Sequence, residues 1–437
     1  MKRHRTAWRL VLLFAVIALV AAACGDDDAG TTTTAAVAAT TATTTAPATT
    51  AAPATTAAPA TTAAPVDTSP IKIGALTALT ATFTPWGVHA RDGMQLAVDE
   101  INATGGVGGR PLELIVADTQ SNAEEGVSAF ERLIEDGVVA VGGIISSDVG
   151  LATARVAEEL ETPLFLVKAG SGAILTQDSR YTFRTCLPAA PMAAGPIGQY
   201  AAADGLTKVG AIIADYAWGQ AIKSALEAEF AGRPDIEIQI EVAPISETDF
   251  TTYLRSLEAF GPELIVATGH PPGAGAITVQ SAALGIDVPI TGAWFPLSLI
   301  MGGGAAEAGL GRFSDFGCAD YFSASYEDLA RRYLAATDNV FLEDDAVAGY
   351  GIVTMVAAAV AAVGDDPVAI AEWLHGETFD LPGYSFQMGW TAWGELATAE
   401  ILFVVIGDQA PPEGVNESGE WYPELLIKSE PLEPFVP

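Results

Sequence analysis

The sequence predicts an α/β protein of two doubly wound lobes, each built on a parallel sheet and joined to the other by crossover hinge strands. Its 437 residues, 50% of them hydrophobic, exceed the ~250–300 residues at which a single core usually divides. From residue 71 onward, short apolar runs alternate with amphipathic stretches, a pattern typical of parallel strands covered by helices on both faces. This series occurs twice. Because ligands bind at the carboxyl ends of such strands, two facing lobes are expected to form a cleft.

The N-terminal residues 1–23 have the pattern of a secretory signal peptide. A basic start is followed by the apolar run 10–23, which is shorter than the ~20 residues that a spanning helix needs. The ending Ala21-Ala22-Ala23-Cys24 resembles a bacterial lipobox, with Ala in place of the usual first Leu. This resemblance implies cleavage before Cys24, its lipidation, and an extracytoplasmic protein anchored by lipid to the outer face of the bacterial cell membrane. The alternative is an uncleaved anchor with an incidental Cys.

Residues 24–69 are predicted to be a disordered stalk. They consist almost entirely of Thr, Ala, Pro and acidic residues, and Pro recurs every six residues from Pro47 to Pro65. Such a segment cannot bury enough apolar area to offset the entropy of ordering, and its prolines keep it extended.

The first lobe is predicted at residues 70–185. Each expected strand is a short apolar run, and each expected helix carries apolar residues at helical spacing, as Met94, Val98 and Ile101 do. Strands are expected at 71–76, 112–117, 138–141 and 163–167, with helices at 87–103, 124–135 and 151–161.

The second lobe is predicted at residues 186–317 by the same criteria. Strands are expected at 209–214, 236–242, 264–268 and 289–293, with helices at 220–231, 250–260 and 274–284.

The remaining chain is predicted to cross between the lobes again. Helices expected at 326–336, 346–363 and 368–374 have no further sheet of their own. Residues 318–380 are therefore predicted to return to the first lobe, and residues 381–437 to return to the second lobe and form a C-terminal tail.

Composition excludes several classes of function. A formal charge of −34 argues against a nucleic-acid partner, because phosphates need a basic surface. Three Cys and four His are too few for a disulfide scaffold or a His/Cys metal cluster. No metal and no cofactor are expected.

Several motifs carry a family resemblance. The most specific is the helix ending Glu100-Ile101-Asn102 with its Gly-rich turn to Arg110, and others are Ile71-Lys72-Ile73-Gly74, Ala117-Asp118-Thr119-Gln120-Ser121, Asp215-Tyr216-Ala217-Trp218-Gly219-Gln220 and Thr248-Asp249-Phe250. On these motifs, residues 70 to about 407 resemble the type I periplasmic binding proteins. The branch they resemble is the leucine/isoleucine/valine-binding receptors of ABC transporters.

Ser146 and Ser147 are candidates for binding a ligand carboxylate. They follow a predicted strand and precede a helix, so hydroxyls and free backbone N–H groups meet there. The family resemblance implies that Ser146 binds the α-carboxylate of the ligand. The alternative is plain N-capping, and the adjacent Asp148 would repel an anion unless it turns away.

Ala169 and Ser171 follow the next strand. The resemblance implies that the Ala169 carbonyl receives a ligand ammonium and that the Ser171 hydroxyl receives a carboxylate. The alternative is a loop of small residues suited to a tight turn. Lys168, immediately before, could pair with a ligand anion or with Asp148.

Trp86 and Trp218 occupy matching positions after the first strand of each lobe. Facing each other across the cleft, they could cover a ligand with large area at low rotamer cost, and the resemblance implies that aromatic residues close on the ligand there. Ordinary packing between the lobes is the alternative.

The resemblance weakens at the other end of the expected pocket. His270 stands where branched-chain receptors carry a tyrosine pair, and Trp294 aligns with the Glu that pairs with the ligand ammonium. A buried ammonium without a carboxylate is costly. An aromatic, amide or less charged solute is therefore an alternative to a branched-chain amino acid, although a lone His such as His270 is often structural.

Cys186 and Cys318 remain as a pair in an oxidising compartment if Cys24 is lipidated. The segments that end in them resemble the two crossover strands of the family, which run side by side. The resemblance therefore implies a disulfide at the hinge, with two buried thiols as the alternative.

The absence of catalytic motifs favours a binding protein over an enzyme. The sequence has no Gly-x-Ser-x-Gly, His-Glu-x-x-His, P-loop or Cys-x-x-Cys motif. We expect a monomeric receptor that closes on a small organic solute and presents it to an ABC permease and its ATPase chains, touching the membrane through its N-terminal lipid alone. A ligand-sensing ectodomain that signals through a partner membrane protein is the alternative, and a surface-anchored hydrolase is a third possibility.

Overall fold

The computed structural model describes residues 67–292 and 294–437. The predicted signal peptide, the lipidation site Cys24 and nearly all of the predicted stalk lie outside the described residues.

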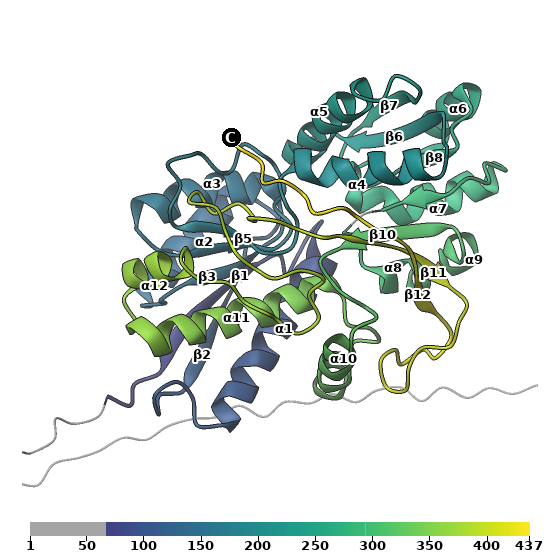
Figure 1. Cartoon of the computed structure of the whole chain (residues 1–437). Helices are drawn as coiled ribbons and strands as arrows, with labels where there is room; N and C mark the ends of the chain where they lie inside the picture. Colours follow the sequence, from purple (N-terminus) through teal and green to yellow (C-terminus); the bar gives the residue numbers. More distant parts are fainter. Residues whose placement is uncertain (1–66, 293) are drawn as a thin grey trace, which may run out of the picture. The chain divides into compact units, whose positions relative to one another are not determined.

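The first lobe is built on a parallel sheet of five strands in the order β2-β1-β3-β4-β5 (Figure 1). Its strands are β1 (Ile71–Thr77), β2 (Leu112–Asp118), β3 (Val141–Ile144), β4 (Leu164–Leu166) and β5 (Thr182–Arg184). The helices that follow the first three strands are α1 (Thr84–Ala103), α2 (Ala123–Glu135) and α3 (Ser147–Glu159). Two helices begin earlier than predicted: α1 because Pro85 suits a first helical turn, and α3 because Ser146 takes the extended conformation of an N-cap.

The second lobe carries a sheet of seven strands in the order β12-β11-β10-β9-β8-β6-β7. Its strands are β6 (Lys208–Ala214), β7 (Glu237–Ala243), β8 (Leu264–Val266), β9 (Ile290–Thr291), β10 (Phe313–Gly317), β11 (Leu402–Gly407) and β12 (Tyr422–Lys428). Strands β6 to β10 pair in parallel, whereas β11 and β12 are antiparallel additions. The predicted parallel sheet of the second lobe is thus confirmed, with two antiparallel strands added at one edge.

The helices of the second lobe include several that the sequence pattern did not reveal. They are α4 (Ala190–Ala203), α5 (Ala217–Ala231), α6 (Thr251–Phe260), the 3-10 turn η1 (Pro271–Gly273), α7 (Ala274–Ala283), α8 (Leu297–Gly302) and α9 (Ala306–Gly309). Helix α4 was missed because Pro196 lies inside it, where proline normally breaks a helix.

Helices α10 (Ala324–Ala336), α11 (Asp344–Val363) and α12 (Pro367–Leu374) lie between β10 and β11 in the chain. Helix α11 packs closely on α1 of the first lobe (Figure 1). The contact depends on two glycines: a Cβ on Gly93 would lie 2.0 Å from the Ala346 carbonyl oxygen, and one on Gly349 would lie 2.1 Å from that of Ala90. Helix α11 is long and apolar enough to cross a bilayer, but 67% of that stretch is buried within the protein, as expected of a core helix.

The return to the second lobe is made at β11, later than the predicted boundary at 381. Before β11, Trp390 and Glu395 still contact the end of β5. The Trp390 Nε1–H donates to the Arg184 carbonyl at 2.6 Å, and Glu395 pairs with the Arg184 side chain. The segment that closes the chain therefore spans both lobes.

A disulfide joins the two segments in which the chain leaves one lobe and passes to the other. Cys186 follows β5 and Cys318 follows β10, and the two are bonded with a Cα–Cα distance of 5.1 Å. The bond thus ties together the two segments that the sequence suggested as crossover strands.

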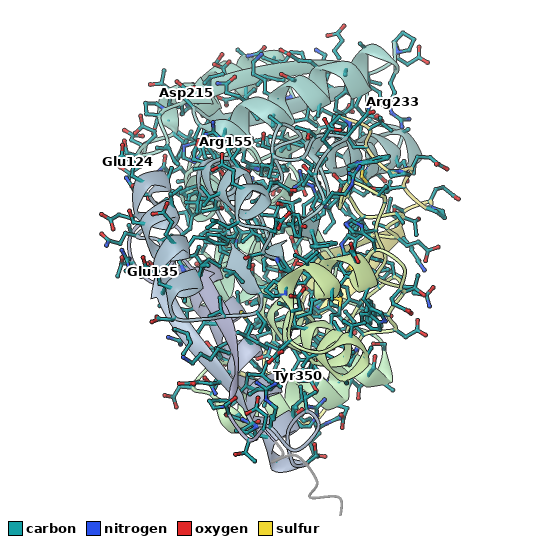
Figure 2. All side chains as sticks on the ribbon, turned by 90° about the vertical axis from the view of Figure 1, so that its left-hand side faces the viewer. Glu124, Glu135, Arg155, Asp215, Arg233 and Tyr350 are labelled. Carbon is teal, nitrogen blue, oxygen red and sulfur yellow. A yellow bond between two sulfur atoms is a disulfide. The ribbon has the colours of Figure 1, made fainter. Side chains whose placement is uncertain are left out.

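The charged side chains lie mostly at the surface. Figure 2 shows Glu124 and Glu135 projecting from α2 and Asp215 projecting beside α5. With 54 acidic against 20 basic residues, this surface is strongly negative.

Candidate ligand-binding site

A pocket lies between the two lobes, at the carboxyl ends of their strands. Its cavity volume is about 30 Å³, and all the empty space there, including the open mouth, amounts to about 350 Å³. The first lobe contributes Phe83, Trp86, Ile145 and Lys168, and the later chain contributes Leu187, Tyr216, Trp218, Pro271 and Trp294.

Trp86 and Trp294 meet across the pocket. Trp86 stands in the first turn of α1, and its Nε1–H donates to the Trp294 carbonyl at 3.2 Å. Beside this bond, the rings of Phe83 and Tyr216 lie 5.8 Å apart across the same boundary. The lobes are therefore in direct contact around the pocket, and the contact is made by aromatic side chains.

Trp218 enters from the start of α5 and lies against the loop after β4. Its Nε1–H donates to the Thr268 carbonyl at 2.9 Å, which orients the indole. A Cβ on Gly170 would lie 2.3 Å from the Trp218 ring. The glycine of the Ala169-Gly170-Ser171 loop is thus what lets the indole approach so closely.

Ser146 and Ser147 are buried at the N-terminus of α3, next to the pocket-lining Ile145. Ser146 is the N-cap residue but makes no side-chain capping bond. The Ser147 Oγ accepts from the Ser171 backbone N–H at 3.1 Å. Neither serine is among the residues that line the pocket, so their role as carboxylate ligands stays a prediction.

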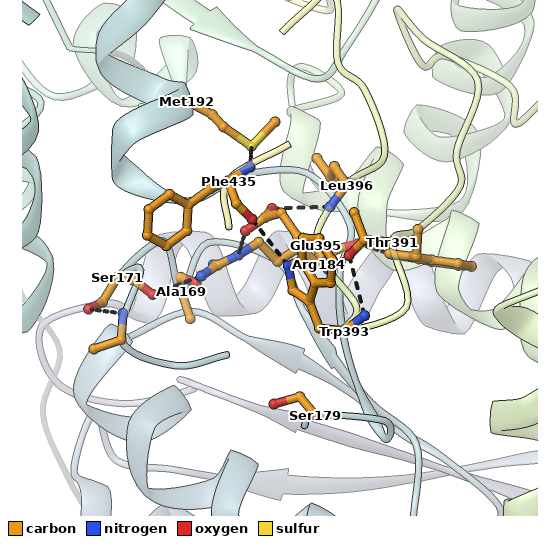
Figure 3. A network of polar contacts seen from close by, with 12 residues as sticks. Ala169, Ser171, Ser179, Arg184, Met192, Thr391, Trp393, Glu395, Leu396 and Phe435 are labelled. Carbon is orange, nitrogen blue, oxygen red and sulfur yellow. Dashed lines mark hydrogen bonds and ion pairs between the residues drawn. The ribbon is translucent and has the colours of Figure 1, made fainter. Parts of the chain in front are cut away.

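The Ala169 and Ser171 carbonyls are occupied by Arg184 (Figure 3). The guanidinium of Arg184, fully buried, donates to the Ala169 carbonyl and, at 2.7 Å, to the Ser171 carbonyl. Its Nε donates to Glu395 at 2.8 Å. The Ala169 carbonyl, predicted to receive a ligand ammonium, therefore already holds a cation of the protein itself.

His270 lies inside the second lobe and is not among the residues that line the pocket, so its role as a ligand contact stays a prediction. It is fully buried, its Nε2 lies 2.9 Å from the Pro244 carbonyl, and its Nδ1 accepts from the Gly273 N–H at 3.1 Å. Both ring nitrogens are engaged in holding the turn that begins η1. The neighbouring Pro271 lines the pocket instead.

Lys168 belongs to a buried charge cluster beside the pocket. Its Nζ donates to the two Asp344 carboxylate oxygens at 2.6 and 2.7 Å and to the Trp294 carbonyl at 3.2 Å. Asp345 lies 3.8 Å away. Asp148, one of the two partners suggested for Lys168, is not involved: its carboxylate accepts from the Ala217 N–H of the second lobe.

The pKa values of three other carboxyl groups of this cluster are raised by burial and by the charges of neighbouring carboxylates. Burial, reinforced by the charge of Asp344, raises the pKa of Asp315 to about 8. Burial raises the pKa of Glu343 to about 7, although the Ser298 and Leu297 N–H groups oppose the change. Burial also raises the pKa of Asp345, whose oxygens have no hydrogen-bond donor among the described residues.

These shifts predict that stability falls as the pH rises from 6.5 to 8.5. A carboxyl with a raised folded pKa keeps a proton that the unfolded chain, with a pKa near 4, releases. Its stabilising contribution is present at low pH and is lost as the pH rises through about 7 for Glu343 and about 8 for Asp315. We expect a loss of about 1–3 kcal/mol over this range, measured by urea unfolding.

The range stops at 6.5 because His89 acts in the opposite direction below it. Burial lowers the pKa of His89 to about 4, so protonation of the unfolded chain destabilises the fold between 6.5 and 4. The control is Asp315→Asn, which should flatten the slope. A wild-type slope of zero or of opposite sign between pH 6.5 and 8.5 would contradict the prediction.

The sequence reasoning missed five of the lining residues. Phe83 and Tyr216 are the N-cap residues of the helices that carry Trp86 and Trp218. Tyr216 already stands in the motif that contains Trp218, and extending the Trp86 motif by two residues would have found Phe83. The others are the apolar Ile145, Leu187 and Pro271, which carry no distinguishing signal.

Comparison with known proteins agrees with this fold. A family model described as periplasmic binding protein matches residues 70–408. A Leu/Ile/Val-binding protein homolog from Brucella abortus is 25% identical over 305 residues, covering 69% of this chain and 81% of its own length.

Solved structures have the same fold. A leucine-binding protein from Thermotoga maritima has a TM-score of 0.69 at 20% identity, covering 83% of this chain and 99% of its own. A solute-binding protein of an ABC transporter from Rhodopseudomonas palustris, in complex with 3,4-dihydroxybenzoic acid, has a TM-score of 0.70 at 20% identity. That match covers 84% of this chain and 99% of its own.

Proposed function

The chain belongs to the type I periplasmic binding protein family, in its leucine/isoleucine/valine-binding branch, and on this premise we propose that it is the solute-binding receptor of an ABC importer. It works outside the cytoplasm and closes its two lobes around a small organic solute. The observation that carries the proposal is the pocket between the lobes, with Trp86 on one side and Trp218 and Trp294 on the other.

Closure needs only a solute that prefers the closed state. The bond from Trp86 to the Trp294 carbonyl and the contact of Phe83 with Tyr216 hold the lobes together in part. A ligand between the indoles adds contacts to both lobes at once, and so shifts the equilibrium further toward closure. The crossover segments joined by Cys186 and Cys318 are the place for the hinge.

The residues at the pocket favour binding without turnover. Among the described residues that line it, Lys168 is the one with a charged side chain, and Asp344 holds it with two hydrogen bonds. General acid–base catalysis needs a group that is free to exchange a proton with the substrate. We therefore propose that the protein binds its solute and releases it chemically unchanged.

The partners proposed are the permease and ATPase chains of the importer. Acidic side chains at the surface, such as Asp215 beside the start of α5 (Figure 2), are suited to dock on a basic permease surface. We further propose that the receptor is a monomer tethered by a lipid on Cys24.

The test is a thermal-shift screen of the mature protein against amino acids, amides and aromatic acids, followed by calorimetry. A ligand at 100 times its Kd adds about 2.7 kcal/mol to the stability of the folded form. We expect at least one solute to bind with a stoichiometry of one and to be recovered unchanged. Turnover of the solute, or no binding across the screen, would contradict the proposal.

Replacing Trp86 with alanine is expected to weaken solute binding by about 10- to 100-fold, because the burial of an aromatic side chain is worth about 1.5–3 kcal/mol. Ser146→Ala should weaken it less. The matched control is Trp373→Ala on α12, whose indole packs against Phe379 outside the pocket. If Trp86→Ala and Ser146→Ala both leave the calorimetric affinity unchanged, the pocket is not the binding site.

A further inference from the structure

We propose that the pocket selects an apolar solute that carries a carboxylate or carboxamide oxygen and no ammonium group, and that it rejects α-amino acids. This inference rests on the proposed receptor function and names its class of solute. It depends on three features. Carbonyl oxygens that could accept from a ligand ammonium already accept from the protein, the side chain of Lys168 brings its own ammonium group, and the indole N–H of Trp294 has no acceptor in the described part of the chain.

Two carbonyl oxygens at or beside the pocket that could receive a ligand ammonium are already in use. The Ala169 carbonyl accepts from Arg184, and the Trp294 carbonyl accepts from both Trp86 and Lys168. No Asp or Glu is among the described residues that line the pocket. An amino acid entering this space would lose the hydration of its ammonium without gaining an anionic partner, which is strongly unfavourable.

Lys168 places a positive charge where such an ammonium would have to fit. Lys168 lines the pocket, and its Nζ lies 3.2 Å from the carbonyl oxygen of Trp294, another lining residue, and is held by both Asp344 oxygens. Asp344 itself is buried behind Lys168 and is not a lining residue. A ligand ammonium would therefore be repelled by the Lys168 side chain without reaching the Asp344 carboxylate, whereas a neutral or anionic oxygen would not be repelled.

Trp294 offers the complementary group, a hydrogen-bond donor. Its side chain is 3% exposed, and its Nε1–H has no acceptor among the described residues. Buried donors are rarely left unpaired, and an oxygen on a ligand would satisfy this one. The residue also has φ 55°, in the left-handed region that bulky residues avoid, and strain of this kind clusters at ligand sites.

The rest of the pocket suits an apolar body. The rings of Trp86, Trp218, Phe83 and Tyr216 surround the space, and aromatic rings pack well on the faces and edges of one another. A single ring with a short acidic or amide chain matches this lining. The class therefore includes arylalkanoates and their amides.

The experiment compares probes that differ in one group. Binding of 3-phenylpropanoate, 3-phenylpropanamide and L-phenylalanine to the mature chain is measured by calorimetry at pH 7. We expect one or both of the first two to bind at least about 30-fold more tightly than L-phenylalanine, which is about 2 kcal/mol at 1.4 kcal/mol per tenfold. The carboxylate and amide probes distinguish an anionic from a neutral solute.

A variant tests the assigned donor. Trp294→Phe keeps an aromatic ring but removes the N–H, and it should weaken binding of the preferred probe about 5- to 10-fold. Trp373→Phe, outside the pocket, is the matched control and should have no effect. Thermal unfolding of both variants shows whether the fold is kept.

The outcomes separate this inference from the receptor function. L-phenylalanine binding as tightly as the deaminated probes overturns the inference and leaves the receptor in place. Failure of all three probes, while an α-amino acid binds in the broad screen, also overturns the inference alone. Failure of every solute in that screen overturns both. Unchanged affinity in Trp294→Phe removes the assigned role of Trp294.

Discussion

Replacing Glu395 with alanine is expected to lower the free energy of unfolding by about 3–5 kcal/mol, because it leaves a buried charge without its counter-ion. Arg184 is fully buried and Glu395 is 1% exposed, with 2.8 Å between Nε and the carboxylate. Without Glu395, the guanidinium keeps neutral partners such as the Ala169 and Ser171 carbonyls. Urea unfolding monitored by circular dichroism measures the loss.

Two controls separate this effect from the removal of any carboxylate. Glu395→Gln keeps a hydrogen-bond acceptor and should cost less than Glu395→Ala. Glu258→Ala breaks an exposed pair with Arg255, whose side chain is 53% exposed, and should cost less than about 1 kcal/mol. Equal losses in Glu395→Ala and Glu258→Ala would show that Arg184 does not depend on its buried partner.

Removing the disulfide by the double substitution of Cys186 and Cys318 with serine is expected to destabilise the protein by about 2–5 kcal/mol. The bond closes a loop across a sequence separation of 132 residues, and such a long loop restricts the unfolded chain strongly. The double variant avoids a lone buried thiol. Its unfolding free energy, compared with that of the oxidised wild type, gives the contribution of the bond.

A reducing agent provides the matching control. It should destabilise the wild type by a similar amount and leave the double variant unchanged, since the described residues contain no other cysteine. A reductant effect of equal size on both proteins would assign the loss to some cause other than this disulfide.

From the sequence we could predict those residues of the site that lie just after the carboxyl end of a strand. Trp86, Trp218 and Trp294 each follow a strand at its carboxyl end, and the parallel arrangement brings such positions to one edge of a sheet. Of the two partners suggested for Lys168, a ligand anion or Asp148, the second is replaced by Asp344, which is 176 residues away. Only the return of α11 to the first lobe brings that carboxylate next to the lysine.

The Arg184 and Glu395 pair was missed for the same reason. The two residues are 211 positions apart, and nothing in their local sequence distinguishes them from the other charged residues of an acidic chain. The pair nevertheless decides the chemistry of the predicted site, since Arg184 occupies the Ala169 carbonyl. The antiparallel strands β11 and β12 were not predicted, because they do not belong to the alternation of strands and helices from which the other strands were recognised.

The amino-acid sequence by itself determined the two α/β lobes and the family, because apolar periodicity and short motifs are local properties that survive without knowledge of the packing. It also singled out the three indoles at the pocket, Trp86 and Trp218 by their place just after a strand and Trp294 by the family resemblance. Only the tertiary structure decided which polar groups at the pocket are free. Hydrogen bonds and ion pairs between residues far apart in the chain depend on where the crossovers place them, and those contacts leave the Trp294 N–H unpaired while they occupy the neighbouring carbonyls.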